Sequence, residues 1–88
     1  MTKIHKKTWM PYFQKIVDGK KTFDARLANF DCKVGDVLVL EEYNPKIKKY
    51  TGRKLEKKIS FILNTKTQKF WSQSDIKKNG LLILSFTK

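Results

Sequence analysis

The segment over residues 19–27 constrains the fold of this chain most, because a helix-ending glycine is followed by alternating apolar and polar side chains. Gly19 is typical of the residue that ends a helix in a left-handed conformation. In an extended strand, successive side chains point to opposite faces. Three apolar side chains should therefore share one face, which can join a core: Phe23, Ala25 and Leu27. The opposite face should be polar and charge-paired: Thr22, Asp24 and Arg26.

Turn residues divide the rest of the chain into short elements. Met10-Pro11 predicts the start of a helix, because proline is well tolerated in the first turn, and Asp18-Gly19 predicts its end. Ile4-His5 is expected to open a short strand, and Ser74-Asp75 to cap a brief helical turn. Further strands are expected over residues 21–28, 36–43, 50–64 and 81–86, with a loop over residues 29–35.

The length of the chain suits one domain over residues 1–88. Short strands with a helix near the start fit a small closed or half-open barrel, so we expect an α+β fold. Cys32 is the single cysteine, which excludes an intrachain disulfide, fits a reducing cytoplasm and suits packing against the core. No apolar run approaches the roughly 20 residues that span a bilayer, so no membrane partner is expected.

Positive charge dominates the composition. Twenty lysine and arginine residues against eight acidic ones give a net charge of +12, and all but two of the twenty are lysine. Such a field attracts polyanions and speeds their encounter. Lysines spread along a chain are also what a compositional bias produces, since dedicated nucleic-acid surfaces more often enrich arginine. The charge favours a nucleic acid or an acidic protein as partner and leaves a compositional origin open.

The segment from Gly19 to Arg26 reads G-x-K-x-x-D-x-R and resembles the signature of the ASCH domain family. The turn Val34-Gly35-Asp36 resembles the turn that starts the second strand of that family, and the closing run over residues 80–85 resembles its last strand. The stretches over residues 40–43 and 50–53 are similar to a small, mostly uncharacterised ASCH-related branch. The resemblance covers nearly the whole chain. It implies a PUA-like β-barrel of about five mostly antiparallel strands with one or two short helices, and an association with RNA.

The first hypothesis is a module that holds RNA, or a single nucleotide, in a basic cleft. Six residues are candidates for nucleic-acid binding: Trp9, Lys21, Asp24, Arg26, Glu42 and Arg53. The two arginines carry planar donor groups that suit phosphates and base edges, and Asp24 is close enough along the strand to orient Arg26 or Lys21. The resemblance implies that Glu42 lies near the same cleft. Four aromatic residues could stack on a base or serve the core: Trp9, Tyr12, Phe70 and Trp71.

An enzyme is the second hypothesis. In ASCH-type enzymes that remove the acetyl group from N4-acetylcytidine, the lysine that matches Lys21 works with a threonine three residues later and with a glutamate. Asp24 occupies that threonine position here, and a carboxylate does not replace a hydroxyl in acyl transfer with the same partners. A small amidohydrolase for N4-acylated cytidine-type nucleosides would use Lys21, Asp24 and Glu42 in altered roles. Asp24 therefore favours binding over catalysis.

A third hypothesis is an interaction domain for an acidic protein. The sequence contains no phosphate-cradling glycine motif and no Ser/His/Asp arrangement, so no nucleotide cofactor is expected. A lone His5 with a lone Cys32 predicts no metal site. As partners we expect nucleic acid, with RNA favoured over DNA, or a small nucleoside, and we expect the chain to be a monomer.

Overall fold

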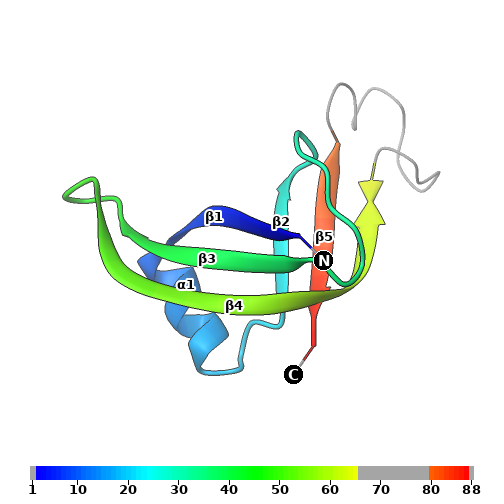
Figure 1. Ribbon diagram of the computed structural model, residues 1–88. Coiled ribbons are helices and arrows are strands. Elements are labelled where there is room, and N and C mark those ends of the chain that lie inside the picture. The colour runs from blue at the N-terminus through cyan, green and yellow to red at the C-terminus, as the bar shows by residue number, and fades with distance from the viewer. Residues whose placement is uncertain (1, 66–79, 88) are drawn as a thin grey trace.

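The computed structural model describes residues 2–65 and 80–87 as five strands and one helix (Figure 1). Along the chain these elements are β1 (Lys3–Trp9), α1 (Met10–Val17), β2 (Phe23–Leu27), β3 (Val37–Asn44), β4 (Lys49–Asn64) and β5 (Leu81–Phe86). The expected strand over residues 81–86 is confirmed, and β1 extends well beyond the short strand expected at Ile4-His5. The cap expected at Ser74-Asp75 lies outside the described residues.

One mixed sheet holds the five strands in the order β1-β3-β4-β5-β2. β1 runs parallel to β3, and the other three pairs are antiparallel. The long β4 pairs with β3 as far as Lys58 and with β5 from Ile59 onward, and the register of the β4–β5 pairing shifts between Ile59 and Phe61. Figure 1 shows the two halves of the sheet running in different directions, joined by β4. Among the described residues β1 and β2 remain unpaired edges, so the fold is a small α+β domain with an open sheet.

The helix α1 follows β1 without a loop and packs against β1 and β3. Pro11 lies in its first turn, where a missing backbone donor is harmless, and Phe13 and Ile16 form its buried face. Gly19 then adopts a φ of 77°, and its N–H donates to the carbonyl of Ile16 at 3.1 Å. The expected helix start and stop are confirmed. Within the described ranges, no helix is long and apolar enough to cross a bilayer.

The core lies between the two halves of the sheet and α1. Its buried side chains are Phe13, Ile16, Leu38, Leu40, Ile59, Leu82 and Leu84. Cys32 is half-buried and packs against this cluster, which confirms the packing role expected for it. Burial, followed by the nearby carboxylates of Asp36 and Asp31, raises the pKa of the Cys32 thiol, so this thiol is a poorer nucleophile than an ordinary cysteine.

The alternation expected in β2 is present, but the buried face is the polar one. Asp24 is 4% exposed, whereas Phe23 is 46% and Leu27 is 54% exposed. The reason is register: Asp24 pairs with Leu84 of β5, and Leu84 points into the core. The expectation that the apolar side of this strand joins the core was therefore wrong. The apolar run of β5 is buried on one face, where Leu82 and Leu84 lie, whereas Leu81 on the other face is 44% exposed.

Asp36 ties the start of β1 to the loop before β3. Its carboxylate accepts hydrogen bonds from the backbone N–H groups of Thr2 at 3.0 Å and Lys33 at 2.9 Å. These two bonds hold the pKa of the Asp36 carboxyl below its ordinary value. The bonds favour the charged form, so the local structure depends on Asp36 being ionised.

Acid should weaken the fold through Asp36. Because the folded-state pKa is lowered, the stabilisation is complete above the ordinary aspartate pKa and is lost as the pH falls from there through the lowered value. We expect Asp36→Asn to melt below the wild type at neutral pH, and the difference to shrink once the pH falls below about 4. Thermal melts of both proteins between acid and neutral pH measure this. A difference in melting temperature between the two proteins that stays constant with pH would contradict the role of the Asp36 charge.

Candidate functional site

A cleft of about 390 Å³ opens where β1, α1 and β2 come together. Its walls are formed by Lys7, Thr8, Trp9, Tyr12, Lys21, Phe23, Asp24, Ala25 and Arg26. The arrangement follows from the chain path, because β1 leads directly into α1 and the turn after Gly19 returns the chain to β2. Four of the six residues expected in the site therefore meet in this cleft: Trp9, Lys21, Asp24 and Arg26.

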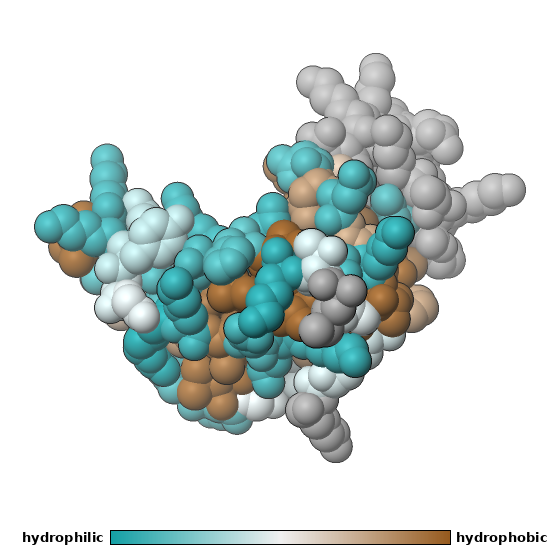
Figure 2. Space-filling model, in the orientation of Figure 1, coloured by the Kyte–Doolittle hydropathy of each residue, from teal (hydrophilic) through white to brown (hydrophobic). Residues whose placement is uncertain are grey.

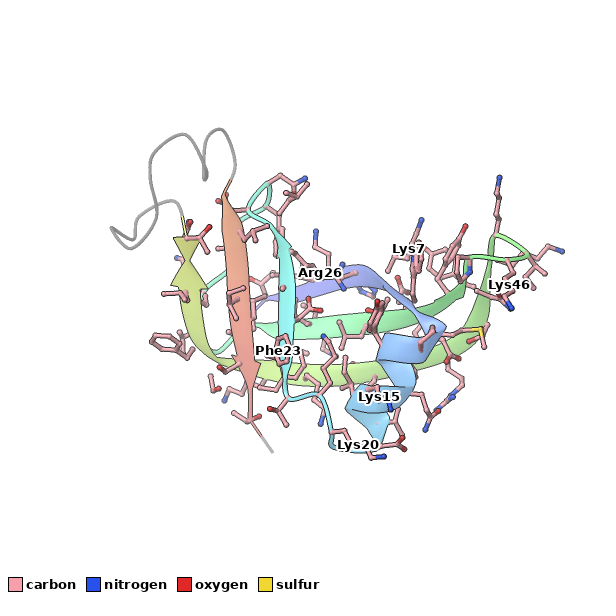
Figure 3. The ribbon with its side chains drawn as sticks, turned by 180° about the vertical axis from the view of Figure 1, so that it is seen from behind. Lys7, Lys15, Lys20, Phe23, Arg26 and Lys46 are labelled. Atoms are coloured by element: carbon pink, nitrogen blue, oxygen red, sulfur yellow. The ribbon has the colours of Figure 1, made fainter. Side chains whose placement is uncertain are left out.

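The buried carboxylate of Asp24 organises the cations of the cleft. The Nε of Arg26 donates to Asp24 Oδ2, and Lys21 Nζ lies 3.8 Å from Asp24 Oδ1. Arg26 also donates from Nη2 to Thr8 Oγ1 at 3.1 Å, so its guanidinium spans from β2 to β1. In Figure 3 Arg26 lies between these two strands, with Lys7 farther along β1. Asp24 thus fixes the direction of Arg26 rather than merely neutralising it.

Lys21 and Arg26, the two cations that face Asp24, are similarly withdrawn from solvent. Lys21 Nζ donates to the carbonyl oxygen of Phe23 at 2.7 Å, and the Lys21 side chain is 19% exposed. Burial lowers the pKa of Lys21, Arg26 lowers it further, and the carboxylate of Asp24 opposes the shift. Lys21 is held in one place at the base of the turn, where its amine can donate to an anion or a carbonyl group.

Three aromatic side chains in the cleft are unusually exposed. Trp9 is 52%, Tyr12 is 56% and Phe23 is 46% exposed, and all three line the same opening. They come from β1, α1 and β2 respectively, so their rings border the cleft on different sides. Exposed aromatic rings beside ordered cations offer flat surfaces for a planar ligand.

Glu42 and Arg53 form a separate polar cluster that does not line the cleft. Glu42 is 3% exposed, accepts a hydrogen bond from Thr51 Oγ1 at 2.6 Å, and lies 3.5 Å from Arg53 Nη1. Arg53 also donates to Gln14 Oε1 at 3.1 Å, and its guanidinium lies 5.0 Å from the centroid of the Phe13 ring. These contacts tie β4 to α1. Glu42 is nevertheless one strand away from the cleft, because it is aligned with Thr8 in the pairing of β1 and β3.

Four cleft residues were not singled out from the sequence as site residues: Lys7, Thr8, Phe23 and Ala25. The parallel pairing of β1 with β3 places Lys7 and Thr8 in the cleft, and no local sequence pattern predicts that pairing. Phe23 has the pattern of a core residue, and its exposure follows from the reversed orientation of β2. Tyr12 was named from the sequence as an aromatic residue that could stack on a base or serve the core, and the structure shows it 56% exposed in the cleft.

In residues 2–65 and 80–87, no group of three or more His, Cys, Asp or Glu side chains is arranged to hold a metal ion. His5 faces a single carboxylate, with Nδ1 at 3.5 Å from Glu41 Oε2, and is exposed. The chemistry of the cleft is therefore that of hydroxyl, ammonium, guanidinium and carboxylate groups with aromatic rings.

The fold and the cleft define a small, basic α+β domain whose open cleft combines exposed aromatic rings with ordered cations. The model of a protein family described as a domain of unknown function, DUF3850, matches residues 4–86. The chain therefore belongs to the DUF3850 family. No curated protein matches the chain.

Proposed function

We propose that this protein binds RNA and holds an unpaired nucleotide of the strand in the cleft between β1, α1 and β2. The observation that carries the proposal is the meeting of three exposed aromatic rings and three cations in one cleft. Stacking of a base on an aromatic side chain contributes roughly 1–3 kcal/mol and requires a base that is free of its neighbours. The aromatic residues are Trp9, Tyr12 and Phe23, and the cations are Lys7, Lys21 and Arg26.

The size and charge of the cleft support a nucleotide as ligand. A volume of about 390 Å³ is at the small end of the range for small-molecule sites, which fits one nucleotide rather than a duplex. The net charge of +12 attracts a polyanion and would speed its arrival. Lysines elsewhere on the surface would then contact the flanking phosphates without reading sequence.

Arg26 is the residue best placed to recognise the ligand. Asp24 and Thr8 already hold its guanidinium across the gap between two strands, so less conformational freedom is lost when a ligand binds. Its planar donors suit a phosphate or the edge of a base. Lys21 would supply a second donor, and Asp24 would act by orienting both cations rather than by contacting the ligand.

We extend the proposal to the fold and to the compartment. The sheet would be an open relative of the PUA-like barrel of ASCH domains, with β1 and β2 as the strands that closure would bring together. The bond from Arg26 to Thr8 supports this idea, because it already links those two edges. The position of the G-x-K-x-x-D-x-R segment along one wall of the cleft also supports it. A half-buried, unpaired Cys32 suits a reducing cytoplasm.

Removing one ring or one cation from the cleft should weaken RNA binding selectively. We expect Trp9→Ala to raise the dissociation constant for a labelled single-stranded RNA by about tenfold, the loss of one stacking contact. Arg26→Ala should weaken binding by a similar factor. Trp9 donates no side-chain hydrogen bond that caps α1, so its truncation leaves the helix start intact. Fluorescence anisotropy at low and moderate salt measures both variants.

Two matched variants outside the cleft control for surface chemistry and charge. Tyr50 is 54% exposed, which is close to the exposed fraction of Trp9. Tyr50→Ala therefore removes a comparably exposed aromatic ring outside the cleft. Lys58 is exposed on β4, and Lys58→Ala removes the same charge as Arg26→Ala. If all four variants bind equally well, and all binding disappears at moderate salt, the charge acts as a nonspecific polyanion trap and the proposal fails. Duplex RNA binding as tightly as single strands would also contradict it.

A further inference from the structure

The outer face of the β4–β5–β2 half of the sheet is almost entirely apolar. Register places one row across the three strands at Phe61, Ser85 and Phe23, a second at Leu63, Ile83 and Ala25, and a third at Leu81 and Leu27. Neighbours in such rows point to the same side of a sheet. Ser85 is the one polar side chain among these eight positions, which together we call the outer apolar face.

The outer apolar face is exposed rather than covered by the described part of the chain. Phe61 is 59%, Leu27 is 54%, Phe23 is 46% and Leu81 is 44% exposed. Figure 3 views the molecule from this side, with β2 and β5 in front of β3 and β4 and with Phe23 on β2. Three strands and three rows at ordinary spacings cover about 300 Å² in projection. An apolar patch of this size on a small soluble domain is commonly an interaction site.

We propose that a second copy of this chain covers the outer apolar face, through sheet-to-sheet packing about a two-fold axis. The absence of charge on this face favours a second copy as the partner. A chain with a net charge of +12 places no charged side chain at any of the eight positions of this face, so two copies can meet here without opposing cations. In Figure 2, which shows the opposite side, hydrophilic side chains spread over β1, β3 and β4 with hydrophobic side chains between them.

The lack of charge on this face also argues against an acidic protein as the partner that covers it. An acidic protein would be drawn to lysines, and this face offers none. A copy of the same face offers apolar rows that can interdigitate about 10 Å apart, as the two sheets of a sandwich do. The contact is small by the standard of stable interfaces, so the dimer should be weak and dependent on concentration.

The dimer does not rest on the proposed RNA function, although two residues belong to both surfaces. Phe23 and Ala25 border the cleft and also lie on the outer apolar face. Variants that test the dimer should therefore avoid both residues. Phe61 and Leu81 are suitable, because both are exposed on this face and neither lines the cleft. The proposal departs from the monomer expected from the sequence, and the following measurement decides between them.

Sedimentation equilibrium of nucleic-acid-free protein should show an average mass that rises from 10.4 kDa towards twice that value. We expect the rise between about 10 µM and 1 mM, the range of weak association. Higher salt should favour the dimer, because it screens the repulsion between two basic copies. Association through contaminating nucleic acid would respond to salt in the opposite direction.

Phe61→Glu should keep the chain at the mass of one copy across the whole range. The change also lowers the net charge, which by itself would ease association, so loss of the dimer would report the apolar contact. Ile47→Glu is the matched control, because Ile47 is 62% exposed in the β3–β4 turn and its substitution changes the charge equally. That variant should dimerise at least as well as the wild type.

A wild-type mass of one copy at the highest concentration and salt would overturn the proposal. A dimer that survives Phe61→Glu in a protein with a native circular dichroism spectrum would overturn it as well. If Phe61→Glu does not fold, Leu81→Glu repeats the test on β5. Amide shifts of the wild type that change with concentration should in either case cluster on β2, β4 and β5, and shifts confined elsewhere would contradict the proposal.

Discussion

Truncating Phe13 to alanine should lower the free energy of unfolding by about 3–5 kcal/mol, the range for a fully buried phenylalanine. Phe13 is 1% exposed and joins the buried face of α1 to Leu38 and Leu40 of the sheet. The Phe13 ring also lies beneath the guanidinium of Arg53, so this contact between α1 and β4 would be lost as well. Small domains unfold with a total of about 5–15 kcal/mol, so this one change removes a large share of the stability.

Tyr12→Ala is the matched control for Phe13, because the two aromatic residues are neighbours on one helix and face different ways. Tyr12 is 56% exposed in the cleft, so its truncation should change the unfolding free energy by less than about 1 kcal/mol. Under the proposed function, the same variant should weaken RNA binding. Urea denaturation followed by circular dichroism measures both proteins. Equal destabilisation by the two variants would mean that α1 does not pack as described.

Local signals in the sequence predicted the helix and the later strands well. Pro11 and Gly19 restrict the backbone where they stand, and the apolar run at residues 81–86 has the length of one strand. The parallel pairing of β1 with β3 could not be read in this way. It brings residues 3–9 beside residues 37–43, and no short pattern encodes a partner so far along the chain.

The sequence predicted which residues at the centre of the candidate site meet, but not which other residues line the cleft or lie outside it. The spacing of Lys21, Asp24 and Arg26 within one turn and strand is local, so their meeting could be expected. Alternation in β2 defined two faces without saying which one is buried, because that choice depends on the pairing with β5. Glu42 and Arg53 lie in a neighbouring cluster, where the register of β3 and β4 shifts between Glu41 and Tyr43.

Replacing Asp24 by asparagine should weaken RNA binding by about three- to tenfold, although it raises the net charge of +12 by one unit. Asparagine keeps the shape of the side chain and one acceptor oxygen, but its hydrogen bonds to Arg26 lose their charge assistance. Without the carboxylate, Arg26 is held less firmly towards Thr8 and the pKa of Lys21 loses the contribution that opposes its lowering. A weaker and less ordered pair of donors then faces the ligand.

The sign of the Asp24→Asn effect separates a built cleft from a general attraction of charge. If binding depends only on the positive field, removing a carboxylate leaves affinity unchanged or improves it. Glu56→Gln supplies the control, because Glu56 is an exposed carboxylate paired with Lys3 outside the cleft and its loss changes the net charge equally. Tighter binding by both variants in parallel titrations would contradict the orienting role of Asp24. Weaker binding by Asp24→Asn alone requires that the arrangement of Lys21 and Arg26, and not their charge, governs recognition.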